Sequence, residues 1–158
     1  MDTEQLERFA SRHVSDFDGV YPADELPDLD AERFCFIANT APRSHPGLHW
    51  VLFHRAGPNR EMNYFCSYGT AATDVSFANL PDRYLESEYR LQSAGTSVCG
   101  QYCLYYAHQL ANEGRSLGEI SDDFYTNTAK NDALVEQWVE RQSLNLMDWD
   151  LHVLARQT

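Results

Sequence analysis

The chain has 158 residues and a formal net charge of −12, from 24 acidic and 12 basic side chains. This length suits one domain with a substantial core, and a hydrophobic content of 43% excludes a disordered chain. No apolar run approaches the roughly 18 residues of a membrane span. The acidic balance excludes the basic footprint of a nucleic-acid-binding protein, and fits either a soluble surface or a basic partner. The first residues form no apolar signal region, so we expect a protein that is not secreted.

The first half of the chain predicts one helix and three strands. Apolar residues at helical spacing predict a short helix over 3–14, with Thr3 as its N-cap. The Gly- and Pro-containing stretch that follows, up to Asp30, is typical of an irregular surface segment. Dense apolar and aromatic runs then predict three strands, at 33–39, 48–54 and 61–66. Short connections favour a small sheet of neighbouring strands.

The second half is predicted to be mainly helical. A short helix or strand is expected near 84–89, and a helix follows directly from Cys99. Two more helices are expected, one near 117–125 and one from Asn131, and the tail 146–158 suggests a terminal strand or docked segment. The predicted fold is therefore a single α+β domain over residues 1–158. Its small, mainly antiparallel sheet packs against a helical half, with Cys99 at the N-terminus of the central helix.

Cys99 is the first candidate for chemistry, because it follows a small polar loop at the start of a helix. Unpaired N–H groups and the helix dipole stabilise a thiolate there, so the pKa of such a cysteine can be lowered if a cation lies near. The same N–H groups can hold an oxyanion. The alternative is a buried, inert cysteine. None of the four cysteines has zinc-ligand spacing, which favours four free thiols.

A nucleophilic cysteine needs a base, and the chain offers six histidines. His49 is the best candidate, because it begins a predicted strand just after a Gly-containing loop, at the rim of the sheet. His54 falls near the other end of that strand, and His108 lies more than two turns along the Cys99 helix. Each of them, taken singly, also fits a surface or structural role.

Three motifs follow one another around the candidate residues. Asn39-Thr40-Ala41 is followed ten positions later by His49-Trp50, then by the segment 65–69, and then by Gln92, seven positions before Cys99-Gly100. In this order the motifs resemble the adenovirus maturation protease family. The segment 17–27 also looks like the branch found in adenovirus-related DNA viruses and large self-replicating transposons. The wider clan includes the SUMO-specific proteases. The resemblance covers roughly residues 17 to 142.

The resemblance implies a role for each matched residue. Cys99 would be the nucleophile and His49 the general base, while Gln92 would share the oxyanion hole with the backbone N–H of Cys99. A glutamine amide is a fixed donor suited to charge that develops in a tetrahedral intermediate. Trp50 and Gly100 would belong to the substrate site, with Trp50 narrowing the cleft so that only glycine fits near the scissile bond. A core tryptophan on an aromatic strand is the alternative for Trp50.

Cys66 departs from the family pattern. An acid on the strand after the histidine orients the imidazole in the family, but here Cys66 occupies that position. A thiol is a weak hydrogen-bond partner, uncharged at neutral pH. Loss of the acid costs about 10⁴ in a serine triad, and we expect a smaller loss for a Cys–His pair. Asp74 or Glu61 could replace the acid from elsewhere, and a zinc site formed with His49 and Cys99 is a further alternative.

The sequence therefore predicts a cysteine endopeptidase that acts through an acyl-enzyme. The resemblance implies cleavage after glycine, maturation of virus-particle precursors, and a location in the virion and in the host nucleus or cytoplasm. An activating peptide is an implied partner. We expect no cofactor, no membrane association and no direct nucleic-acid binding, since the chain is acidic. A catalytically weakened binding protein and a ubiquitin-like-modifier isopeptidase remain alternative functions.

Overall fold

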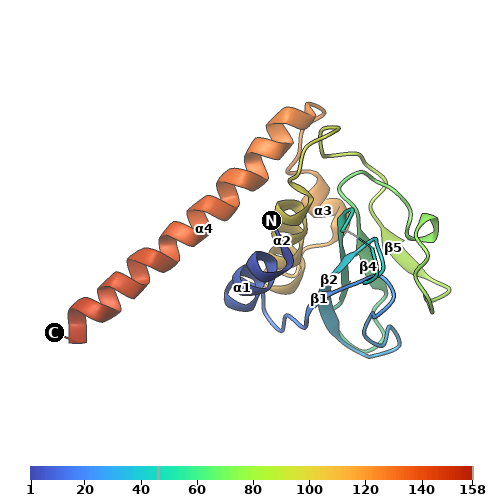
Figure 1. Cartoon of the computed structure of the whole chain (residues 1–158), viewed down its shortest axis with the longest axis horizontal. Helices are drawn as coiled ribbons and strands as arrows, with labels where there is room; N and C mark the ends of the chain where they lie inside the picture. Colours follow the sequence, from blue (N-terminus) through green and yellow to red (C-terminus); the bar gives the residue numbers. More distant parts are fainter. Residues whose placement is uncertain (46, 158) are drawn as a thin grey trace.

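The computed structural model describes residues 1–45 and 47–157, and for 146–154 and 157 the backbone alone. The fold is α+β, as predicted, with five strands in one sheet (Figure 1). Its elements in chain order are α1 (Thr3–His13), β1 (Gly19–Tyr21), β2 (Phe34–Asn39), β3 (Trp50–Arg55), β4 (Met62–Phe65), the 3₁₀ turn η1 (Ala72–Asp74), β5 (Tyr84–Glu86), α2 (Cys99–Ala111), α3 (Leu117–Ser121) and α4 (Thr128–Gln157).

The strands lie in the order β1-β2-β3-β4-β5, which is also their order in the chain. The three central strands pair antiparallel, through registers such as Asn39 with Trp50 and Leu52 with Phe65. The short edge strands β1 and β5 add in parallel, so the sheet is mixed as a whole. The central antiparallel strands are the three predicted from apolar runs, and they place the start of β3 beside the end of β2.

Both faces of the sheet are covered, which explains why β2 is buried along its whole length. Alternate side chains of β2 point to opposite faces. Cys35 and Ile37 join the core beneath the helices, whereas Phe36 and Ala38 join a second core beneath the irregular segments 22–31 and 68–80. Phe36 stacks on Phe53 within that second core, at 5.0 Å between ring centroids. The sheet is therefore the middle layer of the molecule.

Helix α2 is the central helix, and it lies between the sheet, α1 and α4 (Figure 1). Most of its side chains are buried, and the Tyr106 ring stacks on Phe65 of the sheet at 3.6 Å. Helix α1 begins with a capping box formed by Asp2 and Gln5, so Asp2 is the N-cap and the prediction of Thr3 was one residue late. A helix buried on nearly all sides holds its first residue, Cys99, in a fixed position.

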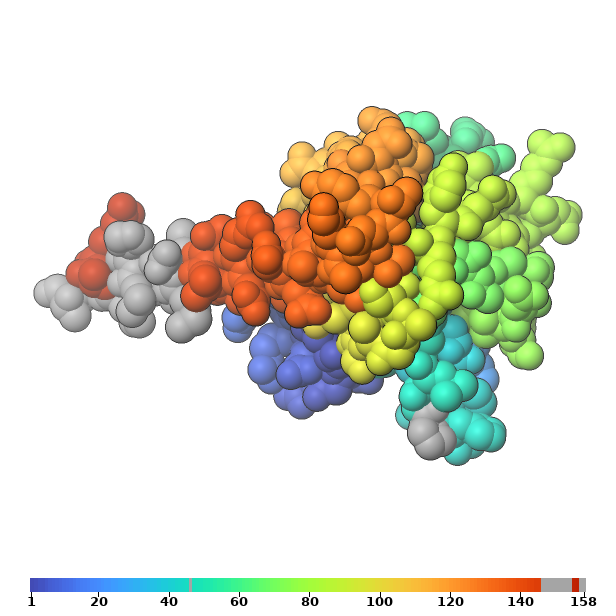
Figure 2. Space-filling view, turned by 90° about the horizontal axis from the view of Figure 1, so that it is seen from above, coloured from blue at the N-terminus to red at the C-terminus, as the bar shows by residue number. Residues whose placement is uncertain are grey.

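Two predicted segments differ from the structure. Residues 19–21 form strand β1, although the segment up to Asp30 was expected to be irregular. The tail was expected to form a strand or a docked segment, but the backbone continues α4 to Gln157. Figure 2 shows α4 extending away from the body of the molecule. The part of α4 whose side chains the structure describes already lies partly beyond that body. None of the described helices combines the length and apolar composition needed to cross a membrane.

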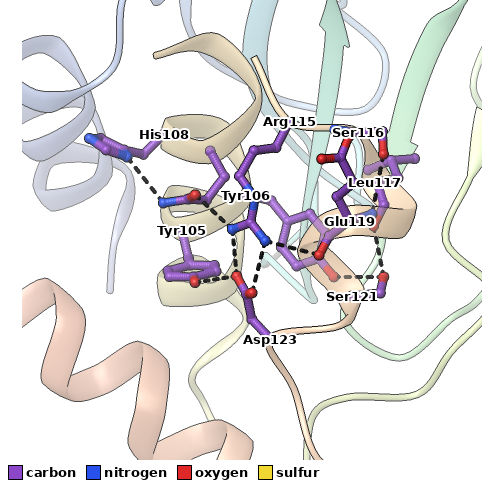
Figure 3. A network of polar contacts seen from close by, with 10 residues as sticks. Tyr105, Tyr106, His108, Arg115, Ser116, Leu117, Glu119, Ser121 and Asp123 are labelled. Carbon is purple, nitrogen blue, oxygen red and sulfur yellow. Dashed lines mark hydrogen bonds and ion pairs between the residues drawn. The ribbon is translucent and has the colours of Figure 1, made fainter. Parts of the chain in front are cut away.

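An ion-pair network fixes the end of α2 against α3 (Figure 3). The Arg115 guanidinium donates to both carboxylate oxygens of Asp123, at 2.6 and 2.8 Å, and also to the Glu119 carbonyl. The hydroxyl of Tyr105, on α2, donates to the same carboxylate at 2.6 Å. These contacts raise the pKa of Arg115 and lower that of Asp123. The network lies away from Cys99 and has the character of a structural brace.

Candidate active site

One cavity brings together four of the six site residues that the sequence singled out. It has a volume of about 950 Å³, and His49, Trp50, Cys66 and Cys99 line it. His49 directly precedes β3, Cys66 directly follows β4, and Cys99 is the first residue of α2. The antiparallel pairing of β3 with β4 and the packing of α2 on β3 bring these three chain segments together.

The His49 ring is held from two sides. Its Nε2 atom lies 3.3 Å from the sulfur of Cys66, a hydrogen-bond distance for a thiol. The ring also stacks on Tyr68, at 4.9 Å between centroids. Cys66 is 2% exposed, so its thiol has little freedom to move away. Since Cys66 takes Nε2, the other ring nitrogen, Nδ1, is the one left to serve a nucleophile.

Burial keeps His49 uncharged. It lowers the pKa of His49 from 6.5 to about 4, because the charged imidazolium is poorly solvated in the cavity wall. A carboxylate at the position of Cys66 would oppose this effect, since a nearby negative charge favours the imidazolium. A thiol supplies no such charge at neutral pH. His49 is therefore a neutral imidazole at neutral pH, able to accept a proton.

The sequence correctly placed Cys99 at a helix N-terminus, and of its two alternatives for the thiol, a lowered pKa or a buried cysteine, the structure favours the second. Burial raises the pKa of Cys99, and the backbone N–H groups of Trp50, Gly100 and Cys99, together with the charged N-terminus, offset this only in part. Desolvation of the thiolate outweighs the helix terminus here. Between the described atoms of Cys99 and His49 there is no hydrogen bond. The resting pair is therefore a neutral thiol and a neutral imidazole, and such contacts often tighten only when substrate binds.

The other cysteines are less accessible than Cys99. All four are free thiols, as predicted, and Cys99 is half-buried whereas Cys35, Cys66 and Cys103 are buried. Burial raises the pKa of Cys35 to about 12 and that of Cys103 well above its ordinary value. These two thiols resist ionisation and lie outside the cavity lining. Among the thiols, Cys99 is consequently the best placed for nucleophilic attack.

Gln92 lies beside this site rather than on the cavity surface. Its side chain is fully buried, and it is not one of the lining residues. Its Nε2 atom donates to the carbonyl oxygen and the hydroxyl of Thr96, at 2.9 and 3.1 Å, and its Oε1 accepts from Ser67 at 2.6 Å. Thr96 does line the cavity, three residues before Cys99. The role of Gln92 in an oxyanion hole stays a prediction, since the amide now contacts Thr96.

Trp50 and Gly100 occupy different positions relative to the cavity. Trp50 is half-buried in its wall, and its indole N–H donates to the Met1 carbonyl at 3.2 Å. Gly100 is buried and is not part of the lining. A Cβ atom at Gly100 would lie 3.0 Å from Leu6 and 3.5 Å from Trp50. Glycine at this position therefore permits α1 and Trp50 to approach α2, and any contact between Gly100 and a substrate stays a prediction.

The two carboxylates that could replace Cys66 as the partner of His49 differ in their positions. Asp74, in η1, lines the cavity with an exposed carboxylate, whereas Glu61 does not line it. The hydrogen bond to His49 comes from Cys66, and among the described residues no hydrogen bond or ion pair joins His49 to either carboxylate. Among the residues whose side chains the structure describes, no group of three or more His, Cys, Asp or Glu residues is arranged to hold a metal ion. The structure thus leaves Cys66 as the observed partner of His49.

Several contributors to the site were not predicted from the sequence. Met1 directly precedes the capping box of α1, lines the cavity and accepts a hydrogen bond from the Trp50 indole. The ring of Tyr68 covers His49, and Thr96 binds the amide of Gln92. Tyr68 was part of the matched motif, so its position was available as a signal. Nothing in the sequence pattern indicated the contacts of Met1 or Thr96.

Comparisons with known proteins show the fold alone. The sequence matches no protein-family model and no curated protein. The structure is similar to the central domain of an uncharacterised protein from Legionella pneumophila, with a TM-score of 0.52 and 12% sequence identity. The similarity covers 94% of this chain and 98% of that one. It shows that an α+β arrangement of this length recurs elsewhere.

Proposed function

We propose that this protein is a cysteine peptidase in which Cys99 is the nucleophile and His49 the general base. One observation carries the proposal: a half-buried thiol at a helix N-terminus and a histidine fixed through its far nitrogen line the same cavity. Nucleophile, base and a group that orients the base are the parts that covalent catalysis requires. The ordered resemblance of the surrounding motifs to the adenovirus maturation protease supports the same function.

The chemistry runs through a thioester. His49 accepts the proton of the Cys99 thiol as the sulfur attacks the substrate carbonyl carbon. The backbone N–H of Cys99, with Gln92 as the second donor, stabilises the oxyanion. The tetrahedral intermediate collapses with cleavage of the C–N bond, and His49 returns the proton to the leaving amine. Water, deprotonated by His49, then attacks the thioester, releasing the acid product and restoring the thiol.

Cys66 makes this enzyme slow in our proposal. The thiol fixes the ring of His49, but it does not stabilise the imidazolium that forms when Cys99 loses its proton. Burial already disfavours that ion, as the lowered pKa of His49 indicates. Both effects raise the barrier to forming the thiolate. The site is arranged for acyl transfer, with a weaker third member than a carboxylate would provide.

The substrates we propose are proteins or peptides with glycine beside the scissile bond. Trp50 lies in the cavity wall next to Cys99, where a bulky ring leaves little room for substrate side chains. From the resemblance, we propose that the natural substrates are virus-particle precursors, with an activating peptide as a further partner. The cavity lining contains Asp24 and Asp74 and no lysine or arginine, which gives no support to a nucleic-acid partner.

A second function is favoured by one observation, the thiol at the position of the family acid. A protease fold that lost its acid could be retained as a binding protein, with the cavity as a peptide groove.

An isopeptidase acting on ubiquitin-like modifiers would use the same residues as the endopeptidase. It differs in substrate, because a glycine-ended tail would enter the cavity attached to a folded protein.

The deciding experiment is cleavage of a fluorogenic peptide ending in Gly-Gly by the purified protein and by Cys99→Ala. Cys103→Ala is the matched control, since Cys103 is on the same helix but fully buried. We expect slow cleavage that Cys99→Ala abolishes and Cys103→Ala retains. Activity equal in Cys99→Ala would overturn the assignment. Peptide binding without cleavage would favour the binding protein, and capture of a ubiquitin-like protein with a C-terminal electrophile would favour the isopeptidase.

A further inference from the structure

A buried set of hydrogen bonds surrounds Gln92, and it extends well beyond the motif residues. The main chain at 91–93 contacts the turn after β4, helix α2 and helix α4, three parts of the molecule that are distant in sequence. Buried main-chain groups need hydrogen-bond partners, and here the partners come from three different parts of the chain. They give the segment one fixed orientation relative to all three.

The direction of the Gln92 amide is fixed by its two partners. The Thr96 carbonyl can only accept a hydrogen bond, so the amide nitrogen must face it. The amide oxygen consequently faces the Ser67 hydroxyl, which donates to it at 2.6 Å. Ser67 is 1% exposed, so no water replaces this donor. Without the hydroxyl, the amide oxygen would be buried without a partner.

Ser67 also fixes the main chain of the same residue. Its carbonyl oxygen accepts from the backbone N–H groups of Leu91 and Gln92, at 2.9 and 3.1 Å. Ser67 directly follows Cys66, the partner of His49. One short turn therefore positions both the ring of His49 and the amide of Gln92.

Helix α4 holds the segment from the other side. Asn131, fully buried, donates to the Leu91 carbonyl at 3.1 Å, and the Asp132 carboxylate accepts from the Ser93 N–H at 3.3 Å. The hydroxyl of Tyr102 lies 2.7 Å from the same Asp132 oxygen and 3.1 Å from the Leu91 carbonyl. Tyr102 is one turn after Cys99 on α2. Asp132 therefore ties the helix that carries the nucleophile to the loop that carries Gln92.

We propose that Ser67 and Asp132 are positioning residues that hold the Gln92 amide with its N–H₂ group against Thr96, on the loop that leads to Cys99, from where it donates to the oxyanion once substrate is bound. The inference rests on the proposed peptidase function. Ser67 selects which end of the amide faces Thr96, and Asp132 fixes the distance between the loop and α2. An amide turned the other way would present its oxygen to the oxyanion and repel it.

The kinetic test compares Ser67→Ala with Ser67→Thr, which keeps the hydroxyl, and with Asp132→Asn, which keeps an acceptor oxygen. We expect Ser67→Ala to lower kcat on the Gly-Gly peptide roughly 10- to 100-fold and to leave KM unchanged. This loss is smaller than the one expected when an oxyanion donor is removed entirely. Alkylation of Cys99 by iodoacetamide forms no oxyanion, so its rate should stay unchanged. Ser121→Ala, which removes a hydroxyl bonded to Tyr106, is the control.

A second readout needs no activity. We expect the side-chain N–H₂ protons of Gln92 to exchange slowly with solvent in the intact protein and in the conservative variants, and faster in Ser67→Ala and Asp132→Ala. Equal protection in all variants would overturn the positioning role, as would equal losses of kcat and of alkylation rate. If the peptide is not cleaved at all, the proposed function fails, while the exchange measurement still decides whether Ser67 and Asp132 fix Gln92.

Discussion

The Nε2 atom of His49 lies 3.3 Å from the sulfur of Cys66, so a thiol is the hydrogen-bond partner of the imidazole. The contact orients the ring, but a thiol lacks the permanent negative charge of a carboxylate. Orientation and electrostatic support are usually provided by the same carboxylate. In this protein the orientation of the ring is present without the charge of a carboxylate, so the effects of orientation and of charge can be measured separately.

Replacing Cys66 with aspartate should restore the charge. We expect Cys66→Asp to raise the pKa of His49 from about 4, since an opposite charge within hydrogen-bonding distance shifts a pKa by about 1–3 units. Peptide cleavage should rise at least about 10-fold, because the imidazolium is then stabilised. Titration of the His49 ring by NMR and the cleavage rate check both effects. Cys66→Asn, which orients without charge, should leave the pKa low and the rate nearly unchanged.

Cys99 should react slowly with alkylating agents at neutral pH, and faster as the pH rises. Burial raises the pKa of Cys99, so the reactive thiolate is a small fraction near pH 7 and grows toward and above pH 9. Iodoacetamide labelling followed by mass spectrometry measures the rate. Labelling should be lost in Cys99→Ala and should spare Cys35 and Cys103, which are buried. Rapid labelling at pH 6 would show instead that the thiolate is stabilised.

Acid should destabilise the fold through the half-buried His49 and the buried His54. Burial lowers the pKa of both His49 and His54 to about 4. In the unfolded chain the value is near 6.5, so below pH 6.5 the unfolded state binds protons that the folded state does not. Each histidine should therefore contribute a loss of about 3 kcal/mol between pH 6.5 and 4. Urea denaturation at pH 7 and 4.5 measures the loss, and His54→Gln should reduce it by the share of His54, while His13 and His108, whose pKa values burial also lowers, keep their own contributions.

The ion pair between Arg115 and Asp123 should stabilise the fold more than an exposed pair does. Its two parallel hydrogen bonds are partly shielded, with 28% and 27% of the side chains exposed. We expect Asp123→Asn to cost about 1.5–2 kcal/mol in unfolding free energy. Glu4→Gln, which breaks the exposed pair with Arg8, is the control and should cost at most about 0.5 kcal/mol.

The carboxylate of Asp123 should also make the stability of the fold depend on pH. The guanidinium of Arg115 lowers the pKa of Asp123, so its contribution is present above the pKa of the unfolded carboxyl and is lost as the pH falls through the lower folded value. The difference between Asp123→Asn and the unmodified protein should therefore shrink in acid. A difference that stays constant down to pH 2 would show that the charge is not what stabilises the contact.

Local patterns were sufficient for the elements that carry the candidate site. The apolar runs that became β2, β3 and β4 are continuous because both faces of the sheet are covered, and the helical spacing after Cys99 predicted α2. Strand β1 was missed, because its three residues lie among Gly, Asp and Pro and form a strand only by pairing with Phe36, Ile37 and Ala38. The tail was assigned wrongly, because the spacing of its apolar residues fits both the period of a helix and the period of a strand.

The sequence by itself determined that the fold is α+β, that the three central strands of the sheet precede a helix beginning at Cys99, and that four thiols stay free. Residue types and spacing encode these features directly. Only the tertiary structure decided that His49 contacts Cys66, that Ser67 faces Gln92, and that the pKa of Cys99 is raised rather than lowered. Solvation and through-space contacts depend on which segments cover a residue, and segments far apart in the chain supply that cover.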